Sequence, residues 1–406
     1  MRKKIFLQLL AIFFAFIISP PLRADDFYAV KDKVISDSSF KIGFLYFAPL
    51  LLLENVGYTS SIYTYDAQET PDWSGDLGLG LRASAIVANR LILQAEELPY
   101  YSFYLKNKAL RSWSNRFGAT AYSFVGPLNL KAGFARNDLR QRPHLEFSRP
   151  FHYIDSEWLA ETDIGRKSNL FLTVYSRFKK LAYDAAPYTE NSNLADSLNH
   201  RENVFGLKLN QRVFSSTFVY ANYEISDYVF ATRSERDTSS QTIALGVEFP
   251  EIGILQGSLQ IGIMSLQPAN PLFQKTQRPN GRGEVQITLM ERLRFNLFYE
   301  LQTFFSYSSN DLFYDNQSFG GGAEIYLTRF LKVGNSYQDG RLKYFSFLDL
   351  ALQRSDRVRT QRYYLAVPFL GNTSLGFAYN IYRLSSDVLN LDYTRSFWGG
   401  FISYEF

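Results

Sequence analysis

Two histidines, a serine and an aspartate lie close together in the chain, at His144, Ser148, His152 and Asp155. These are the residue types of a nucleophilic hydrolase site, where an imidazole takes the proton of an attacking hydroxyl. The sequence has no Gly-x-Ser-x-Gly turn that would present such a serine. We therefore predict that the chain is not an enzyme and that these are solvated loop residues, and we keep a hydrolase at the rim of the protein as an alternative.

Acidic and amide side chains that could offer oxygens to Ca²⁺ gather in two stretches: Asp66, Glu69, Asp72 and Asp76, and Asn310, Asp311 and Asp315. Neither stretch has the spaced ligands around a central glycine that a dedicated calcium loop uses. The chain also contains no cysteine, which removes thiolate ligands, lipoprotein attachment and disulfides. We predict no metal and no cofactor.

Arginines form two groups: Arg136, Arg140 and Arg142, and Arg354, Arg357, Arg359 and Arg362. The planar guanidinium group is well suited to phosphate and carboxylate. Such side chains could hold the phosphates of lipopolysaccharide or attract anionic solutes. They could equally pair with neighbouring acids such as Asp138 and Asp356, and the sequence leaves these interpretations open.

The elements that must position these residues are β-strands, because apolar and polar side chains alternate along them. The alternation is clearest over residues 128–134, 205–210, 255–263 and 293–302. A period of two gives a strand two chemically different faces. In a transmembrane barrel one face contacts lipid and the other lines the lumen, whereas a soluble sandwich would place the polar face in water. Alternation alone does not separate these two folds.

The connections favour the barrel. Short turns are predicted at residues 88–90, 126–127, 165–168, 215–216, 250–253, 291–292, 328–329 and 371–372. Longer polar loops centre on residues 66–74, 105–112, 138–150, 184–199, 231–240, 267–282, 307–315, 338–357 and 385–394. Short turns at one end and long loops at the other are typical of outer-membrane barrels. We predict an all-β, transmembrane, antiparallel up-and-down β-barrel of about eighteen strands, with sixteen also compatible.

The polar face of these strands is predicted to line the lumen. The predicted lining residues are Arg82, Gln94, Glu96, Asn129, Lys131, Arg177, Lys208, Asn210, Gln256, Gln260, Glu284, Gln286, Arg294, Asn296, Glu300, Gln302 and Lys332. Charges of both signs with amides between them suit a hydrated wall, and barrels of this size enclose a channel unless something fills it. Inward aromatic residues, among them Phe171, Tyr175, Phe298 and Tyr382, leave partial occlusion open.

Three segments are expected along the chain. Residues 1–24 have the basic start, apolar run and small residue before a cleavage point that mark a secretory signal peptide. Residues 25–40 are a short polar periplasmic segment that either hangs free or enters the lumen, and residues 41–406 form the barrel. The formal charge falls from +4 to 0 on cleavage, because the leader carries four basic residues and no acid. We therefore predict no nucleic-acid partner.

The chain ends in Tyr404-Glu405-Phe406, with an aromatic residue on alternate positions. This ending resembles the last strand of bacterial outer-membrane β-barrels, where it implies recognition by the barrel-assembly machinery and closure against the first strand. The opening residues 49–63, an acidic loop and the strand Leu77–Arg82 are similar to the outer-membrane porins that accompany exopolysaccharide and exosortase systems. In that family Asp and Asn are expected where this chain has Thr59 and Ser61.

These features predict a porin-like channel of the cell outer membrane that passes hydrophilic solutes, with a saccharide or exopolysaccharide role as one version. The expected partners are outer-membrane lipid, lipopolysaccharide, the barrel-assembly machinery and the solutes. A closed barrel with a structural or assembly role is the first alternative, and a rim-active hydrolase is the second.

Overall fold

The structure is a computed structural model. It describes residues 25–62, 70–88, 90–126, 128–142, 147, 150–165, 169–189, 192–214, 216–271, 273–290, 292–307, 311–328, 330–346, 354–370, 373–388 and 391–404. The helices are α2 (Asp25–Ser36), η1 (Lys108–Leu110), α3 (Leu194–Leu198) and η2 (Ser234–Arg236). The strands are β1 (Phe40–Ile42), β2 (Leu45–Thr59), β3 (Asp72–Val87), β4 (Leu91–Tyr104), β5 (Ser112–Val125), β6 (Leu128–Gln141), β7 (Phe151–Gly165), β8 (Leu170–Tyr183), β9 (Pro187–Thr189), β10 (Ser192–Asn193), β11 (His200–Arg212), β12 (Phe218–Phe230), β13 (Thr238–Ile252), β14 (Leu255–Pro268), β15 (Thr276–Leu289), β16 (Leu293–Phe305), β17 (Asp311–Thr328), β18 (Leu331–Ser346), β19 (Ser355–Leu370), β20 (Thr373–Ser386) and β21 (Tyr393–Tyr404).

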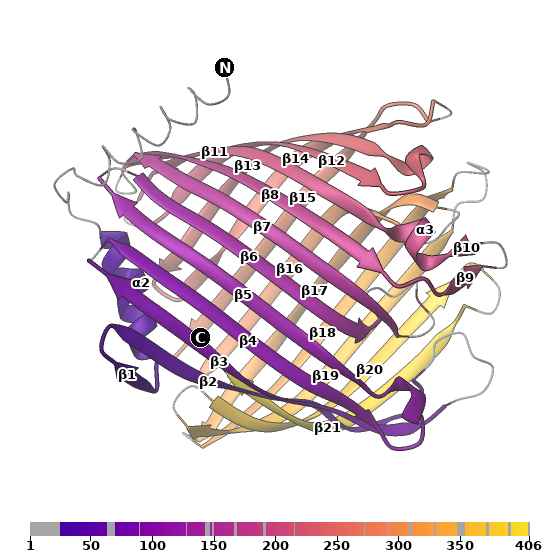
Figure 1. Cartoon of the computed structure of the whole chain (residues 1–406), viewed down its shortest axis with the longest axis horizontal. Helices are drawn as coiled ribbons and strands as arrows, with labels where there is room; N and C mark the ends of the chain where they lie inside the picture. The colour runs from indigo at the N-terminus through magenta and orange to yellow at the C-terminus, as the bar shows by residue number, and fades with distance from the viewer. Residues whose placement is uncertain are drawn as a thin grey trace.

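Strands β2–β8 and β11–β21 form one closed antiparallel barrel of 18 strands, as the sequence predicts. Each strand pairs with the next along the chain, and β21 returns to pair with β2 (Figure 1). Closure gives every strand of the wall a neighbour on both sides, so the backbone groups of the paired residues are satisfied within the wall. The strands run obliquely to the barrel axis, as closure of a twisted sheet requires (Figure 1).

All eight predicted short turns connect consecutive strands at one end of the wall, which we call the short-turn end. The nine predicted longer loops lie at the opposite end, the long-loop end, with α3, β9 and β10 (Figure 1). Several strands extend further than the sequence indicates: β15 begins at Thr276 and β18 continues to Ser346. The extra residues of β15 are mostly polar, whereas those of β18 include Leu342, Tyr344 and Phe345, and cross-strand pairing keeps both segments extended.

The two faces of the wall differ as the alternation predicts. On β14, Leu259, Ile261 and Ile263 are exposed, with Ile261 at 73%. The four tryptophans, Trp73, Trp113, Trp158 and Trp398, are also on the outside, between 37% and 70% exposed. A ring exposed to this degree is not packed beneath a loop. These positions suit an interfacial belt near the long-loop end.

The seam where the barrel closes is short. Among the described residues, the ladder between β2 and β21 joins Val56–Thr59 to Phe397–Gly400 and no further pairs. Just before the seam the β2–β3 ladder shifts register between Glu54 and Gly57, and Asn55 has φ = +53°. This irregularity changes which face odd-numbered residues occupy, because a shift of one residue turns side chains to the opposite face.

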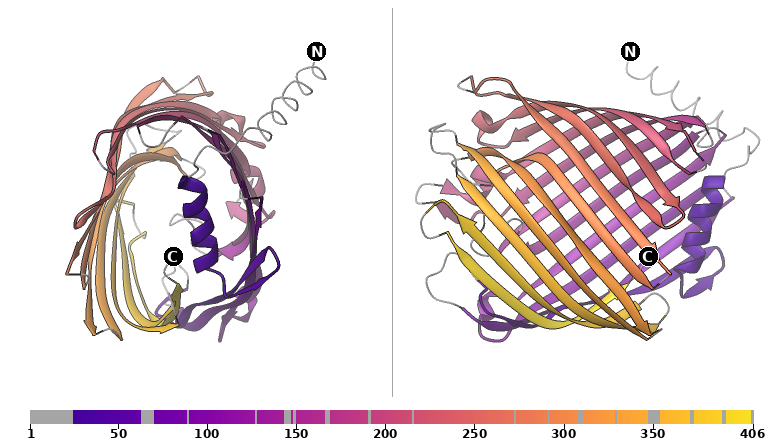
Figure 2. Two further views of the ribbon diagram at one scale, coloured as in Figure 1. Left: turned by 90° about the vertical axis from the view of Figure 1, so that its left-hand side faces the viewer. Right: turned by 180° about the vertical axis from the view of Figure 1, so that it is seen from behind.

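Helix α2 lies at the short-turn end, inside the outline of the wall (Figure 2). Phe27 and Val34 are 1% and 3% exposed and pack on Ile92 and Phe124, which face inward from β4 and β5. With Val30 they form one apolar stripe at a helical spacing. Burial of this stripe offsets the free-energy cost of ordering a short helix. The stripe was not predicted from the sequence, because polar residues lie between its apolar positions.

No helix among the described residues is long and apolar enough to cross a membrane. Residues 1–24, where the sequence predicts a signal peptide, lie outside the described part of the chain.

Candidate channel and its lining

The main cavity of the barrel is a chamber of about 1160 Å³ inside the wall. Its lining comes from the inward faces of β7, β8 and β11–β17, together with residues of the long-loop end. Phe171 and Phe218 lie near its short-turn end, and Ser306 and Tyr307 lie at its long-loop end. The chamber therefore follows the strands from one end of the wall towards the other.

Paired charges line the middle of this chamber. Lys208 Nζ lies 2.5 Å from Glu248 Oε1, and an Arg177 guanidinium nitrogen lies 3.1 Å from Glu202 Oε1. The hydroxyl of Tyr228 donates to Glu202 at 3.0 Å, and that of Tyr175 donates to Glu224 at 2.8 Å. These contacts spread charges of both signs along the wall, and a tyrosine hydroxyl rather than a cation binds Glu224.

Aromatic rings alternate with these pairs. Phe171 and Phe218 meet edge to face at 5.8 Å between ring centroids, and Tyr228 and Phe305 lie 4.0 Å apart. The Lys208 ammonium group lies 4.0 Å from the centroid of Tyr220. A solute in the chamber would meet flat apolar faces beside hydrogen-bonding groups, the combination that holds polar ligands in many binding sites.

The structure places the predicted lining residues as follows. Those that line the chamber are Arg177, Lys208, Asn210, Gln260 and Gln302. Those that line a second cavity, of about 530 Å³ beside α2, are Arg82, Gln94 and Glu96. Those that line a third cavity, of about 380 Å³ near the short-turn end, are Gln256, Glu284 and Gln286. The third cavity shares Phe218, Glu248 and Ser258 with the chamber, so the two lie side by side.

The remaining predicted lining residues are Asn129, Lys131, Arg294, Asn296, Glu300 and Lys332. Directly paired residues of neighbouring strands share a face. Asn129 and Lys131 are paired with Phe124 and Tyr122, whose rings contact the α2 cluster. Asn296 is paired with Gln286, and Glu300 with Arg282 of the chamber. Arg294 lies 3.7 Å from Glu324, and the side chain of Lys332 is buried near the ring of Tyr326.

Sequence reasoning missed much of the chamber lining, including Glu202, Glu224, Glu248, Tyr220 and Tyr228. Glu202 shares the alternation of Lys208 and Asn210 on β11, so extending that pattern to the start of the strand would have found it. The other four lie on β12 and β13, for which no lining residue was predicted. The partner of each residue is set by the register between strands, which the sequence does not supply.

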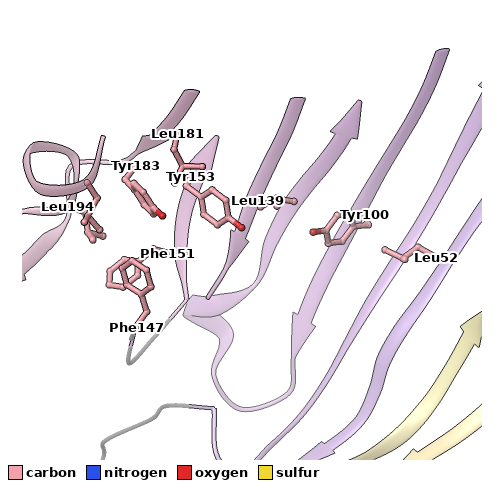
Figure 3. Close-up of a cluster of buried hydrophobic side chains, with 10 residues drawn as sticks. Leu52, Tyr100, Leu139, Phe147, Phe151, Tyr153, Leu181, Tyr183 and Leu194 are labelled. Carbon is pink, nitrogen blue, oxygen red and sulfur yellow. The ribbon is translucent and has the colours of Figure 1, made fainter. Parts of the chain in front are cut away.

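A cluster of apolar side chains covers part of the long-loop end (Figure 3). It runs from Leu52 and Tyr100 across to Tyr183 and Leu194. Phe147, from the loop between β6 and β7, is 1% exposed, and its ring lies 5.4 Å from that of Tyr307, which follows β16. Because these two rings come from different parts of the wall, the cluster narrows the long-loop end from within.

Arg236 holds this end together. Its side chain is 1% exposed and donates to the carbonyl oxygens of Ser197 at 3.2 Å and of Ser306. Its guanidinium group also lies 4.6 Å from the ring centroid of Phe230. One buried cation therefore joins three loops, and these contacts would have to break if the loops moved apart.

Of the candidate hydrolase residues, His152 and Asp155 lie in the described part of the chain, and they occupy opposite faces of β7. His152 Nε2 lies 2.7 Å from Asp138 and Nδ1 lies 2.8 Å from Asp184, so carboxylates occupy both ring nitrogens. Asp155 lies on the other face of β7, 3.3 Å from Lys179. His144 and Ser148 fall outside the described residues. His152 has no nitrogen left to accept a proton from a serine.

His152 provides a pH-dependent contact at the outer rim. It lies on the outward face of β7, six residues on the long-loop side of Trp158, and so beyond the tryptophan belt. Partial burial lowers the pKa of His152, but its hydrogen bonds to Asp138 and Asp184 outweigh this and raise the pKa above its ordinary value. A raised pKa means that folding is favoured by protonation.

We expect His152→Gln to destabilise the barrel at pH 6 by up to about 1 kcal/mol, since the pair is partly exposed. The contribution is fully present below the ordinary histidine pKa and is lost as the pH rises through the raised one. Thermal unfolding of both proteins in detergent, from pH 5.5 to 8.5, measures this difference. An Asp184→Asn variant should show part of the same pH-dependent loss. A His152→Gln effect that is equal at every pH would contradict the assignment.

The acidic stretches do not form a metal site in the described part of the chain. Asp72 accepts backbone N–H groups of Trp73, Lys106 and Asn107, which fastens the loop after β4 to the start of β3. Asp76 accepts the hydroxyl of Ser102, and Asp315 accepts that of Thr303. Asp66, Glu69 and Asn310 lie outside the described residues.

The second arginine group is divided by the alternation of β19. Arg354 forms a two-pronged pair with Asp356 at 3.0 and 2.5 Å, as the sequence analysis allowed. Arg362 also points inward and lies over the ring of Phe401. Arg357 and Arg359 occupy the opposite, outward face. The arginines that are neighbours in the sequence therefore lie on opposite faces of the wall.

The whole architecture has counterparts among solved structures. A crystal structure of Pseudomonas aeruginosa OpdK with vanillate aligns with a TM-score of 0.51 at 12% identity, covering 89% of this chain and 99% of that chain. A crystal structure of the outer membrane protein OpdK from the same organism aligns with the same score and identity, covering 88% of this chain and 97% of that one. The chain has the fold of outer-membrane porins. No family model and no curated protein match it.

Proposed function

We propose that this protein is a channel of the cell outer membrane that passes small hydrophilic solutes. The observation that carries the proposal is the chamber, which runs inside the barrel along β7, β8 and β11–β17 between paired charges and aromatic rings. Such a wall offers water and polar solutes hydrogen bonds along its length. The outward apolar face with its tryptophans supports the same location.

We further propose saccharides as the preferred solutes. Sugar rings have apolar faces that stack on aromatic side chains, and hydroxyl groups that bond to carboxylates and amides. The vanillate in the OpdK crystal structure is an anionic aromatic molecule. Here the chamber cations Arg177 and Lys208 are paired with acids, which leaves little unpaired positive charge to attract a carboxylate. A role beside exopolysaccharide or exosortase systems is the specific version of this proposal.

The remaining parts of the proposal concern export and assembly. Residues 1–24 direct export, and residues 25–40 stay at the periplasmic side, where α2 docks. Tyr404 ends β21, and Phe406 lies beyond the described residues. We propose these two aromatic residues as the signal for the barrel-assembly machinery. Lipopolysaccharide is the proposed lipid partner.

Single-channel recording of refolded residues 25–406 in a planar bilayer tests the function. We expect steady ohmic steps that a malto-oligosaccharide blocks at lower concentration than vanillate does. Stronger block by vanillate would contradict the saccharide preference. Silence from protein that is demonstrably folded and inserted would contradict the open channel.

We expect Lys208→Gln to make the channel more cation-selective. Removing Lys208 leaves Glu248 unpaired in the chamber, and one charge acting over about 8 Å in water changes an ion's energy by about 0.5 kcal/mol. The change favours a cation and disfavours an anion by this amount, so the permeability ratio of cation to anion should rise by about fivefold. Reversal potentials in a salt gradient measure it. Arg201→Gln, which removes a charge from the exposed outer face of β11, should leave the ratio unchanged.

A closed structural barrel is the second candidate. The apolar cluster around Phe147 and the docked α2 favour it, since each narrows one end of the lumen. The same recordings separate the candidates, because a closed barrel carries no steady current in the wild-type protein.

A further inference from the structure

A basic surface covers the outward face of β18, β19 and β20 near the long-loop end. Its cations are Arg341, Lys343, Arg357, Arg359 and Arg383. They alternate along these strands with buried residues that point into the barrel, such as Leu342, Val358 and Leu384. The five cations therefore lie on the outer wall, away from the chamber. Only Arg357 and Arg359 belong to a group that the sequence analysis recognised.

Strand register brings like charges directly opposite one another on this surface. Arg341 is paired with Arg357, and Arg359 is paired with Arg383. Side chains in such positions have Cβ atoms about 4.5–5.5 Å apart, and like charges there are destabilising. Two arginine pairs side by side on three strands are costly to the isolated protein. An anion bound between them would relieve this repulsion.

The acids of this region neutralise the surface only in part. Asp339 receives a two-pronged contact from Arg357 at 2.9 and 2.6 Å, and Arg359 Nε lies 3.5 Å from it. Asp387 and Asp392 accept backbone N–H groups of Ser355 and Ser386. Asp315 lies opposite Lys343 on the neighbouring strand β17, but it is paired with Arg278 at 3.3 Å and adds no net charge. The five cations against the other three acids leave a formal charge of +2.

Three cations of the surface have no acid of their own. In the part of the chain that the structure describes, no ion pair is formed by Arg341, Lys343 or Arg383. Arg341 and Arg383 instead line a groove of about 840 Å³ with Arg357 and Arg359. Asp339 thus orients two arginines of the groove and leaves the other two available to an external anion.

The wall next to the basic surface, towards the short-turn end, is suited to lipid. Tyr337, Tyr363 and Tyr379 form a row across the same three strands, and Leu365, Leu375 and Phe377 lie beyond them. Tyrosines at such positions mark the level where acyl chains meet headgroups. Arg383 follows Tyr379 by four residues on β20, roughly 13 Å at about 3.3 Å per residue. The arginines therefore lie at the depth of headgroup phosphates.

We propose that the basic surface binds the phosphate groups of a glycolipid in the outer leaflet, whose acyl chains lie against the apolar wall of β18–β20. The proposal rests on the outer-membrane location proposed above and identifies the residues for its lipid partner. Guanidinium groups hold phosphate through paired N–H donors. A soluble phosphate would use the same arginines, but it would gain nothing from the row of tyrosines and the leucines beside them.

The test measures binding of fluorescent bisphosphorylated lipid A to refolded residues 25–406 in neutral detergent micelles. The variant is Arg341→Gln/Arg383→Gln, which spares the Asp339 contacts and removes one cation from each like-charged pair. We expect its affinity to fall by about tenfold or more, since charge-assisted hydrogen bonds are lost. Arg201→Gln, an exposed cation on the outer face of β11, should bind within about twofold of wild type.

Three results would overturn the proposal: equal binding by the double variant, equal binding of dephosphorylated lipid A to the wild type, and full displacement by inorganic phosphate at the lipid's own concentration. If the double variant does not fold, Arg383→Gln alone is expected to show a smaller loss of the same kind. Single-channel conductance of the double variant should equal that of wild type, because neither residue faces the chamber. Failure of the channel proposal would therefore appear in the recordings and not in the lipid binding.

Discussion

Replacing Gly57 by alanine is expected to prevent closure of the barrel. A Cβ atom at this position would lie 2.0 Å from the carbonyl oxygen of Trp398 and 2.4 Å from Cα of Gly399. Both are backbone atoms, so the clash can be relieved only by moving β2 away from β21. The seam has only four residue pairs, and Gly57 opposite Gly399 is one of them.

The expected loss of folded protein is large because the seam lies in the wall that crosses the membrane. An open barrel exposes unpaired backbone groups of two strands, and each such group in hydrocarbon costs several kcal/mol. The folded fraction of Gly57→Ala should therefore be close to zero. Refolding into detergent or lipid, followed by the heat-dependent shift in electrophoretic migration of folded barrels, measures that fraction.

Gly133→Ala is the matched control for this prediction. Gly133 also lies within a barrel strand, but the nearest atoms to an added Cβ are 3.8 Å away, at ordinary contact distance. This variant should fold with the yield of wild type. If Gly57→Ala folded equally well, the close approach of β2 and β21 at the seam would be wrong.

Replacing Phe27 by alanine is expected to release α2 from the inside of the barrel. Phe27 is 1% exposed, and its ring meets that of Phe124 edge to face at 5.5 Å. Truncating a buried phenylalanine typically costs about 3–5 kcal/mol. A helix of 12 residues is marginal in water and has no stability of its own to offset that loss.

The absence of cysteine from the chain makes the release measurable. Val34→Cys places a thiol on the buried stripe of α2, and a water-soluble maleimide should label it slowly while the helix is docked. Adding Phe27→Ala should accelerate labelling by at least about tenfold, since 1.4 kcal/mol corresponds to a factor of ten. If the channel is open, its conductance should also rise, because a body about 10 Å wide leaves the mouth.

Asp32→Ala in the same Val34→Cys background is the control, since Asp32 lies on the exposed face of α2. It should change neither the labelling rate nor the current. Equal labelling of the Phe27→Ala and control proteins would mean that the apolar stripe does not hold α2 in place.

The sequence by itself determined the class of fold and predicted about eighteen strands, and the structure confirms eighteen. Alternation between residues such as Leu259 and Gln260 is a local property, since one strand between lipid and water must carry a different chemistry on each face. Turns and loops are local as well, which is why the short turn near Gly126 and the long loop before β7 were both predicted. An even number of strands then follows from counting them.

Only the tertiary structure decided which residues meet. The pairing of Lys208 with Glu248 and of Arg341 with Arg357 depends on the register of neighbouring strands, and the closure at Gly57 joins the two ends of the sheet. The docking of α2 depends on inward side chains more than 50 residues away, at Ile92 and Phe124. Periodicity along one strand predicts which face of the sheet a side chain occupies, but it does not predict which residue of the neighbouring strand lies opposite. The partner is selected when the barrel closes, because pairing of all the strands fixes their mutual register.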